Sequence, residues 1–178
     1  HVCPKCTAIT FRYYGEHSEL PLDYLALFEY STGMKKILEE IKFKKNKALI
    51  NILQGQIITN APQYTIDMII PVPLNPVRLK ERGFNQAEEM IRSYSRLRNV
   101  PLRTDIVYRG YNTEKMYKLS PKQRRDEVME SFGAWPNKIN EVTNKDILVF
   151  DDNITSGNTI KSILGVLREL KPKTMKVL

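Results

Sequence analysis

An apolar run that ends in two aspartates and a glycine turn constrains this chain more than any other feature. Asp146-Ile-Leu-Val-Phe-Asp151 has the composition of a strand buried on both faces. The helix that follows has an apolar stripe made of Ile160, Ile163, Leu164, Leu167 and Leu170. Residues 151–159 are therefore predicted to form a turn at the carboxyl end of a strand, where ligands bind in open α/β sheets.

Strands and helices are predicted to alternate along the rest of the chain. The remaining predicted strands cover residues 24–30, 67–73, 100–108 and 174–178. One predicted helix begins near Thr32, two more cover 48–58 and 84–94, and a fourth begins near Gly157. Charged residues 42–46 are expected to separate the first helix from the second. A further helical patch is expected at 120–129. This alternation predicts an α/β fold with a Rossmann-like parallel sheet flanked by helices. We expect an N-terminal segment at 1–20 and a main domain at 21–178.

Composition narrows the class of protein without deciding its function. Lys and Arg total 28 against 20 for Asp and Glu, a net charge of +8. This excess fits a polyanionic partner, either nucleic acid or a phosphorylated substrate, although it also fits simple solubility. No apolar run is long enough to span a bilayer and no secretory signal opens the sequence, so we expect no membrane insertion and a cytoplasmic protein. The chain begins at His1 and ends at Leu178 within a predicted strand, which suggests a piece of a longer protein.

The residues of the acidic turn have the chemistry to hold a ribose 5-phosphate. Asp151 and Asp152 can accept hydrogen bonds from vicinal ribose hydroxyls. A helix N-terminus favours phosphate through its unpaired N–H groups and its dipole. The predicted phosphate-binding residues are Thr155, Ser156, Gly157, Asn158 and Thr159. The alternative is an ordinary capped turn with two solvated aspartates.

The same residues resemble the phosphoribosyl-pyrophosphate motif of type I phosphoribosyltransferases. That motif has four apolar residues, two acids, a variable pair and then Thr-Thr-Gly-x-Thr, and Ile147 to Thr159 matches it with Ser156 in place of one threonine. The resemblance implies the type I phosphoribosyltransferase fold and Mg²⁺ bound together with phosphoribosyl pyrophosphate. A Walker loop is excluded because the chain has no Gly-x-x-x-x-Gly-Lys-Ser/Thr.

A second segment carries candidate pyrophosphate ligands. Ile70-Pro-Val-Pro-Leu74 predicts a rigid loop after a buried strand, and Arg78 and Arg82 would share a face of a helical turn. The guanidinium group of arginine can donate two parallel hydrogen bonds to phosphate oxygens, and its charge would stabilise a leaving pyrophosphate. Asn85 and Gln86 would support these arginines without contacting the ligand directly. The alternative is a solvated basic face at the start of an amphipathic helix.

The sequence of this segment resembles that of the ComF/GntX family of competence-associated proteins. Pro-Val-Pro-Leu with Arg78-x-x-x-Arg-Gly-Phe-Asn-Gln86 is the most specific part of a resemblance that covers about residues 24–178. The resemblance implies a cytoplasmic phosphoribosyltransferase fold with a small hood, and a role in the uptake of single-stranded DNA during natural transformation. Met116 and Arg124-Arg125 depart from the family's usual residues in the hood segment, so the acceptor is not supplied by the resemblance.

Cys3-Pro-Lys-Cys6 is half of a possible zinc site. The chain has no further cysteine, which excludes a disulfide framework and favours a reducing compartment. Members of the resembled family carry an N-terminal zinc ribbon with two such pairs, and structural zinc needs four ligands. Cys3 and Cys6 would form a partial zinc-ribbon site, completed by an upstream pair or by His1 or His17. The alternative is a pair of free surface thiols.

Two classes of function follow from these patterns. As an enzyme, the protein would bind phosphoribosyl pyrophosphate with Mg²⁺ at Asp151 and Asp152 and transfer phosphoribose to an unknown acceptor, releasing pyrophosphate. As a binding module, it would bind single-stranded DNA beside a competence helicase, or sense phosphoribosyl pyrophosphate without turnover.

Overall fold

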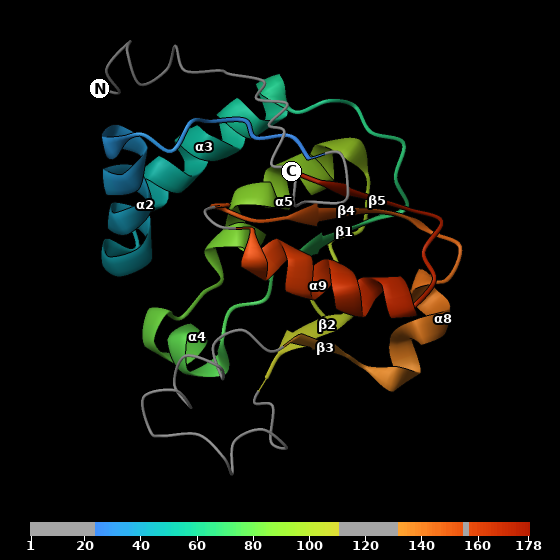
Figure 1. Ribbon diagram of the computed structural model, residues 1–178. Helices are drawn as coiled ribbons and strands as arrows, with labels where there is room; N and C mark the ends of the chain where they lie inside the picture. Colours follow the sequence, from blue (N-terminus) through green and yellow to red (C-terminus); the bar gives the residue numbers. More distant parts are fainter. Residues whose placement is uncertain (1–23, 111–131, 155–156) are drawn as a thin grey trace.

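A computed structural model describes residues 24–110, 132–154 and 157–178 of the chain. Its centre is a three-stranded parallel sheet in the order β1–β4–β5 (Figure 1). The strands are Met68–Pro71, Asp146–Phe150 and Thr174–Val177. Ile69 lies opposite Leu148, which in turn lies opposite Lys176. The predicted parallel sheet is therefore confirmed, with strands slightly shorter than the apolar runs suggested.

Side chains that alternate along the central strands divide the core into two layers. Ile69 and Leu148 pack with one set of helices, whereas Ile70 and Val149 pack with another. The first set is α2 (Thr32–Lys44), α3 (Lys47–Asn60) and α5 (Gln86–Arg98). The second face is covered by α9 (Asn158–Glu169) and the short α8 (Ile139–Val142), which follows the 3-10 turn η1 (Pro136–Lys138) (Figure 1). Helices on both faces explain why β1 and β4 are continuously apolar.

Two predicted strands differ from the structure. From residues 24–30, Tyr24 forms a parallel bridge to Val177, Ala26 is also in a bridge, and the chain then bends at Leu27 and Phe28. The start of the segment thus pairs with the edge strand β5, and Leu25 and Leu27 are buried in the core. From residues 100–108, Leu102 bridges Ile69. The end of that stretch belongs to a separate antiparallel pair, β2 (Val107–Arg109) and β3 (Phe132–Ala134).

Asparagine and serine caps set most of the helix boundaries. Ser31 caps α2 and Asn46 caps α3, each accepting a hydrogen bond from a backbone N–H of the first turn. The charged interruption between these helices is shorter than predicted, because α2 continues to Lys44 and only Lys45 adopts the left-handed conformation. The predicted helix at 84–94 is preceded by a separate short helix, α4 (Pro76–Arg82).

Several predictions fall on residues outside the described ranges. These are the proposed zinc ligands Cys3 and Cys6, the whole N-terminal segment at 1–20 with its boundary, the helical patch at 120–129, and the hydroxyl residues Thr155 and Ser156. Within the described ranges, every helix is too short or too polar to cross a membrane.

Candidate functional site

The candidate site lies where β1 and β4 end side by side. Pro71 is paired with Phe150, and the backbone N–H of Val72 donates to the carbonyl of Phe150 at 2.8 Å. The loop after β1 and the acidic turn after β4 therefore leave the sheet at the same edge. This is the arrangement that the two sequence motifs predict for a shared ligand site.

Asp152 joins the two predicted motifs. Its Oδ1 accepts a hydrogen bond from Gln86 Nε2 at 3.1 Å, and Gln86 Oε1 accepts one from Arg82 Nη1 at 3.0 Å. Its Oδ2 lies 2.8 Å from Lys42 Nζ, and only 7% of the Asp152 side chain is exposed. A buried carboxylate held in this way is oriented before any ligand binds. Lys42 was not among the predicted site residues, although Ile41-Lys-Phe-Lys-Lys45 is part of the family resemblance.

Asp151 is held in an environment that disfavours its charge. The backbone N–H of Asp152 donates to Asp151 Oδ1 at 2.9 Å, which fixes the carboxyl group at the end of β4. Burial and the neighbouring Asp152 carboxylate raise the pKa of Asp151 well above its ordinary value, against opposing effects of Lys42 and Arg109. A bound cation or hydroxyl donors would therefore stabilise the ionised form of Asp151.

Helix α9 begins directly after the acidic turn, at Asn158. Gly157 has a φ of 74°, a left-handed conformation that glycine adopts without strain, and it allows the sharp entry into the helix. The first turn of α9 has no acidic residue, and no side chain of the described residues caps it. Asn158 is exposed and Thr159 is half-buried. These features suit an anion at the helix N-terminus.

The backbone of the Arg82-Gly-Phe-Asn-Gln86 segment positions the Arg82 and Gln86 side chains near Asp152. Gly83 ends α4 with a φ of 78°. Asn85 caps α5 by accepting from the N–H of Ala87 at 3.1 Å, and its Nδ2 donates to the carbonyl of Val72 at 2.9 Å. Asn85 thus ties the start of α5 to the end of β1. Gln86, the next residue, is thereby directed at Asp152.

Four cations surround this junction and are called here the cationic cluster: Lys42, Lys45, Arg78 and Arg82. Lys45 Nζ would lie 3.2 Å from a Cβ added at Gly83, so the end of α2 lies against the end of α4. The Arg82 guanidinium also lies 5.7 Å from the ring centre of Phe43. Burial and the nearby Arg78 lower the pKa of Arg82. Like charges held close together favour binding of a multiply charged anion.

Gly83→Ala is expected to destabilise the protein by about 1 kcal/mol, because a Cβ is strained at this φ and would press on Lys45. Gly55→Ala is the matched control. It lies inside α3 with nothing within 4 Å of the added Cβ, and should stabilise by about 0.5–1 kcal/mol. Urea unfolding of both variants measures the difference. Equal effects of the two substitutions would show that Gly83 is not required for the junction.

Comparisons with known proteins agree with the motifs. No protein-family model matches the chain. Competence protein F of Haemophilus influenzae is 35% identical over 111 residues, which are 62% of this chain and 48% of that protein. Competence protein ComFC of Bacillus subtilis is 25% identical over 174 residues, 90% of this chain and 68% of that protein. The chain is thus similar to ComF-like competence proteins over most of its length.

Other similarities of this ComF-like chain extend the comparison. The DNA utilization protein YhgH of Escherichia coli K12 is 22% identical over 184 residues, 93% of this chain and 77% of that protein. The chain spans about half the length of the Haemophilus relative. Among solved structures, a glutamine phosphoribosylpyrophosphate amidotransferase from B. subtilis, complexed with ADP and GMP, has a TM-score of 0.48 and 17% identity, covering 72% of this chain and 25% of that one.

Proposed function

We propose that this ComF-like chain is a phosphoribosyltransferase-like protein that binds phosphoribosyl pyrophosphate with Mg²⁺. The observation that carries the proposal is the hydrogen bond between Gln86 and Asp152, which joins the Arg-Gly-Phe-Asn-Gln segment to the acidic turn. Two motifs that are far apart in the sequence, and that suggest one ligand, thus meet at one sheet edge. The names of the competence relatives further support a role in DNA uptake.

The roles of the residues follow from their chemistry. Asp151 and Asp152 would accept hydrogen bonds from the ribose hydroxyls, and the N-terminus of α9 would hold the 5-phosphate. The cationic cluster would attract the pyrophosphate and stabilise the charge that develops on it. The paired carboxylates are oxygen donors of the kind that Mg²⁺ prefers, and bound Mg²⁺ would neutralise part of the charge on the substrate. Catalysis would thus depend on positioning and charge.

Displacement at the anomeric carbon would complete the proposed reaction. The carbon–oxygen bond to pyrophosphate breaks with its electron pair going to the leaving group, and a new bond forms to the acceptor. Positive charge that develops on the ribose ring is stabilised by the two adjacent carboxylates, as in glycoside cleavage.

Lys42→Met tests the cationic cluster. Lys42 lies 2.8 Å from Asp152 with its side chain 22% exposed, so its loss leaves a buried carboxylate less well paired. We expect binding of phosphoribosyl pyrophosphate to weaken about tenfold, or about 1.4 kcal/mol, by calorimetry in Mg²⁺.

Lys44→Met is the control for Lys42→Met. Lys44 lies on the same helix and pairs with Glu40 at the surface, with 70% of its side chain exposed. Surface pairs of this type contribute little, so the control should bind like the parent protein. Equal weakening by both substitutions would indicate a general charge effect and remove Lys42 from the site.

Single-stranded DNA and a competence helicase are proposed as partners of the intact protein. The net charge of +8 and the similarity to the DNA utilization protein YhgH favour a nucleic-acid partner. DNA affinity should then fall steeply with salt because counterions are released. Binding of DNA without pyrophosphate release in any acceptor screen would favour the non-enzymatic alternative. Zinc at Cys3 and Cys6 and a cytoplasmic location stay predictions.

A further inference from the structure

A cavity of about 530 Å³ opens directly onto the acidic turn. The segment from Tyr24 to Tyr30 and the turn from Asp151 to Ile154 both line it. Met34 and Leu38 of α2 also belong to the lining. The volume lies within the range of about 300–1,000 Å³ typical of small-molecule sites.

The described lining of this cavity is mostly apolar, and its charged residues are acidic. Phe28, Met34 and Leu38 are among the apolar groups that surround it. Glu29, which is exposed, and the two aspartates are the charged residues among the described lining, and no Lys, Arg or His contributes to that lining. Among the described residues, an anionic ligand would therefore meet three carboxyl groups, of which Asp152 is already paired with Lys42 from outside the lining. A ligand with many polar groups would leave most of them unpaired.

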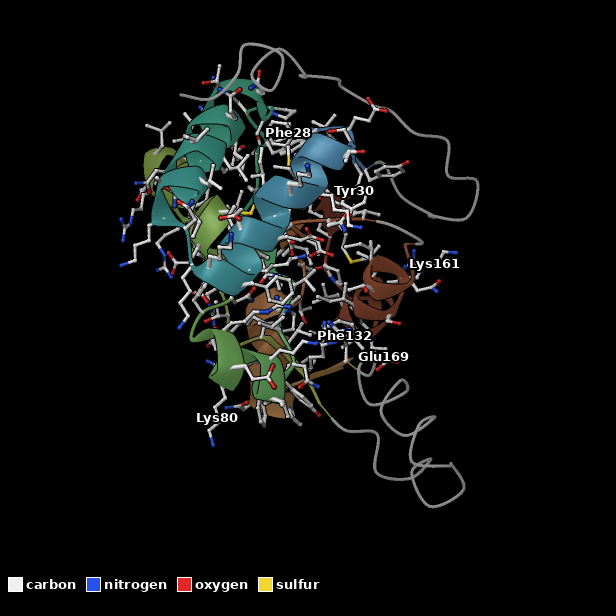
Figure 2. The ribbon with its side chains drawn as sticks, turned by 90° about the vertical axis from the view of Figure 1, so that its left-hand side faces the viewer. Phe28, Tyr30, Lys80, Phe132, Lys161 and Glu169 are labelled. Carbon is white, nitrogen blue, oxygen red and sulfur yellow. The ribbon has the colours of Figure 1, made fainter. Side chains whose placement is uncertain are left out.

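The cavity and the cationic cluster lie at different ends of α2. Leu38 lines the cavity, and Lys42, one helical turn later, contacts Asp152. Figure 2 shows Phe28 and Tyr30 beside the first part of α2, whereas α4, which carries Lys80, lies beyond its other end. A ribose held at the acidic turn would thus have the cavity on one side and the cations on the other. This separation fits a displacement in which acceptor and leaving group occupy different places.

We propose that the cavity is the acceptor site, and that the acceptor is an uncharged, mostly apolar ring compound with one nucleophilic ring nitrogen. This inference rests on the proposed binding of phosphoribosyl pyrophosphate at Asp151 and Asp152. The ring nitrogen attacks the anomeric carbon and forms a carbon–nitrogen bond. The bond from that carbon to pyrophosphate breaks, pyrophosphate leaves with the electron pair, and the proton of the ring N–H passes to solvent.

Benzimidazole and its 5-carboxylate are a matched pair of probes for this site. Both are added to protein saturated with Mg²⁺ and phosphoribosyl pyrophosphate, whose binding is first measured by calorimetry. Binding is followed by saturation-transfer NMR, and turnover by pyrophosphate release. We expect benzimidazole to bind at least about tenfold more tightly than its carboxylate, a difference of about 1.4 kcal/mol. Equal or tighter binding of the carboxylate overturns the inference.

Two substitutions make the assignment specific to the cavity. Met34→Trp, which adds volume at the wall, should abolish benzimidazole binding and leave phosphoribosyl pyrophosphate affinity unchanged. Glu29→Lys, which reverses a charge at the exposed mouth, should improve binding of the carboxylate probe severalfold. Unchanged probe binding in both variants places the probe elsewhere and overturns the assignment. If the parent binds phosphoribosyl pyrophosphate but not benzimidazole, the inference alone fails; if it binds neither, the proposed function fails.

Discussion

Gln86→Glu is expected to lower the free energy of unfolding by about 2–3 kcal/mol at pH 8, less than the full cost of an unpaired buried charge. Gln86 is 4% exposed and donates to Asp152 at 3.1 Å. Glutamate has the same shape but cannot donate when ionised, so two carboxylates would face each other. Arg82, which already donates to this side chain, offsets only part of the repulsion.

The effect of Gln86→Glu should depend on pH with a definite sign. Repulsion raises the pKa of the new carboxyl group in the folded protein above its unfolded value of about 4.3. The loss of stability is therefore absent below about pH 4 and complete above the folded pKa. Urea unfolding at pH 4 and pH 8 measures it.

Gln56→Glu serves as the control for Gln86→Glu. The Gln56 side chain accepts from Asn60 through its Oε1, a contact that glutamate retains, so the change should be near neutral at both pH values. A loss in Gln86→Glu that is the same at pH 4 and pH 8 would contradict the Gln86–Asp152 contact.

Asp151→Asn is expected to stabilise the protein while weakening its binding of phosphoribosyl pyrophosphate about 100-fold, or about 2.7 kcal/mol. Burial and the Asp152 charge raise the pKa of Asp151, so its ionised form costs stability in the folded state. Asparagine retains the oxygen that accepts from the N–H of Asp152. We expect a gain of about 1–2 kcal/mol at pH 8, which corresponds to a rise in Tm of about 4 °C.

The stabilisation by Asp151→Asn should also vanish in acid. Because the folded pKa lies above the unfolded value of about 3.9, the penalty is absent below about pH 4, grows as pH rises from the unfolded towards the folded pKa, and is complete above the folded pKa. Asp67→Asn is the control, since Asp67 lies at the other end of the sheet and its Oδ2 accepts from the N–H of Asp146. That variant should gain no stability. A loss of stability in Asp151→Asn at pH 8 would contradict the environment described for the acidic turn.

The acidic turn and its flanking elements could be predicted because their signals are local. The apolar run that forms β4 is uninterrupted, and the stripe of α9 repeats with helical spacing through Ile160, Ile163 and Leu167. Both elements appear within a residue or two of their expected boundaries. The placement of the motif at the end of a parallel strand followed directly from these patterns.

The contacts that complete the site could not be predicted because they are long-range. Nothing near Lys42 in the sequence indicates a partner, and its ion pair with Asp152 depends on how α2 packs beside the sheet edge. The separate α4, in contrast, had local signals that were not used: Asn75 before Pro76, and Gly83 followed by the cap Asn85. The segment at 24–30 has strand composition, but it pairs with β5 near its start, and Leu25 and Leu27 are buried in a core formed by both helices and strands.

Calorimetry of the parent protein and of the double variant Asp151→Asn/Asp152→Asn, with phosphoribosyl pyrophosphate and Mg²⁺, tests the central claim most directly. Circular dichroism first establishes that the double variant is folded, which is expected because both replacements keep a hydrogen-bond acceptor. The account predicts saturable binding by the parent protein and no detectable binding by the double variant. Equal affinity in the two proteins would contradict the assignment of the acidic turn as the site for phosphoribosyl pyrophosphate.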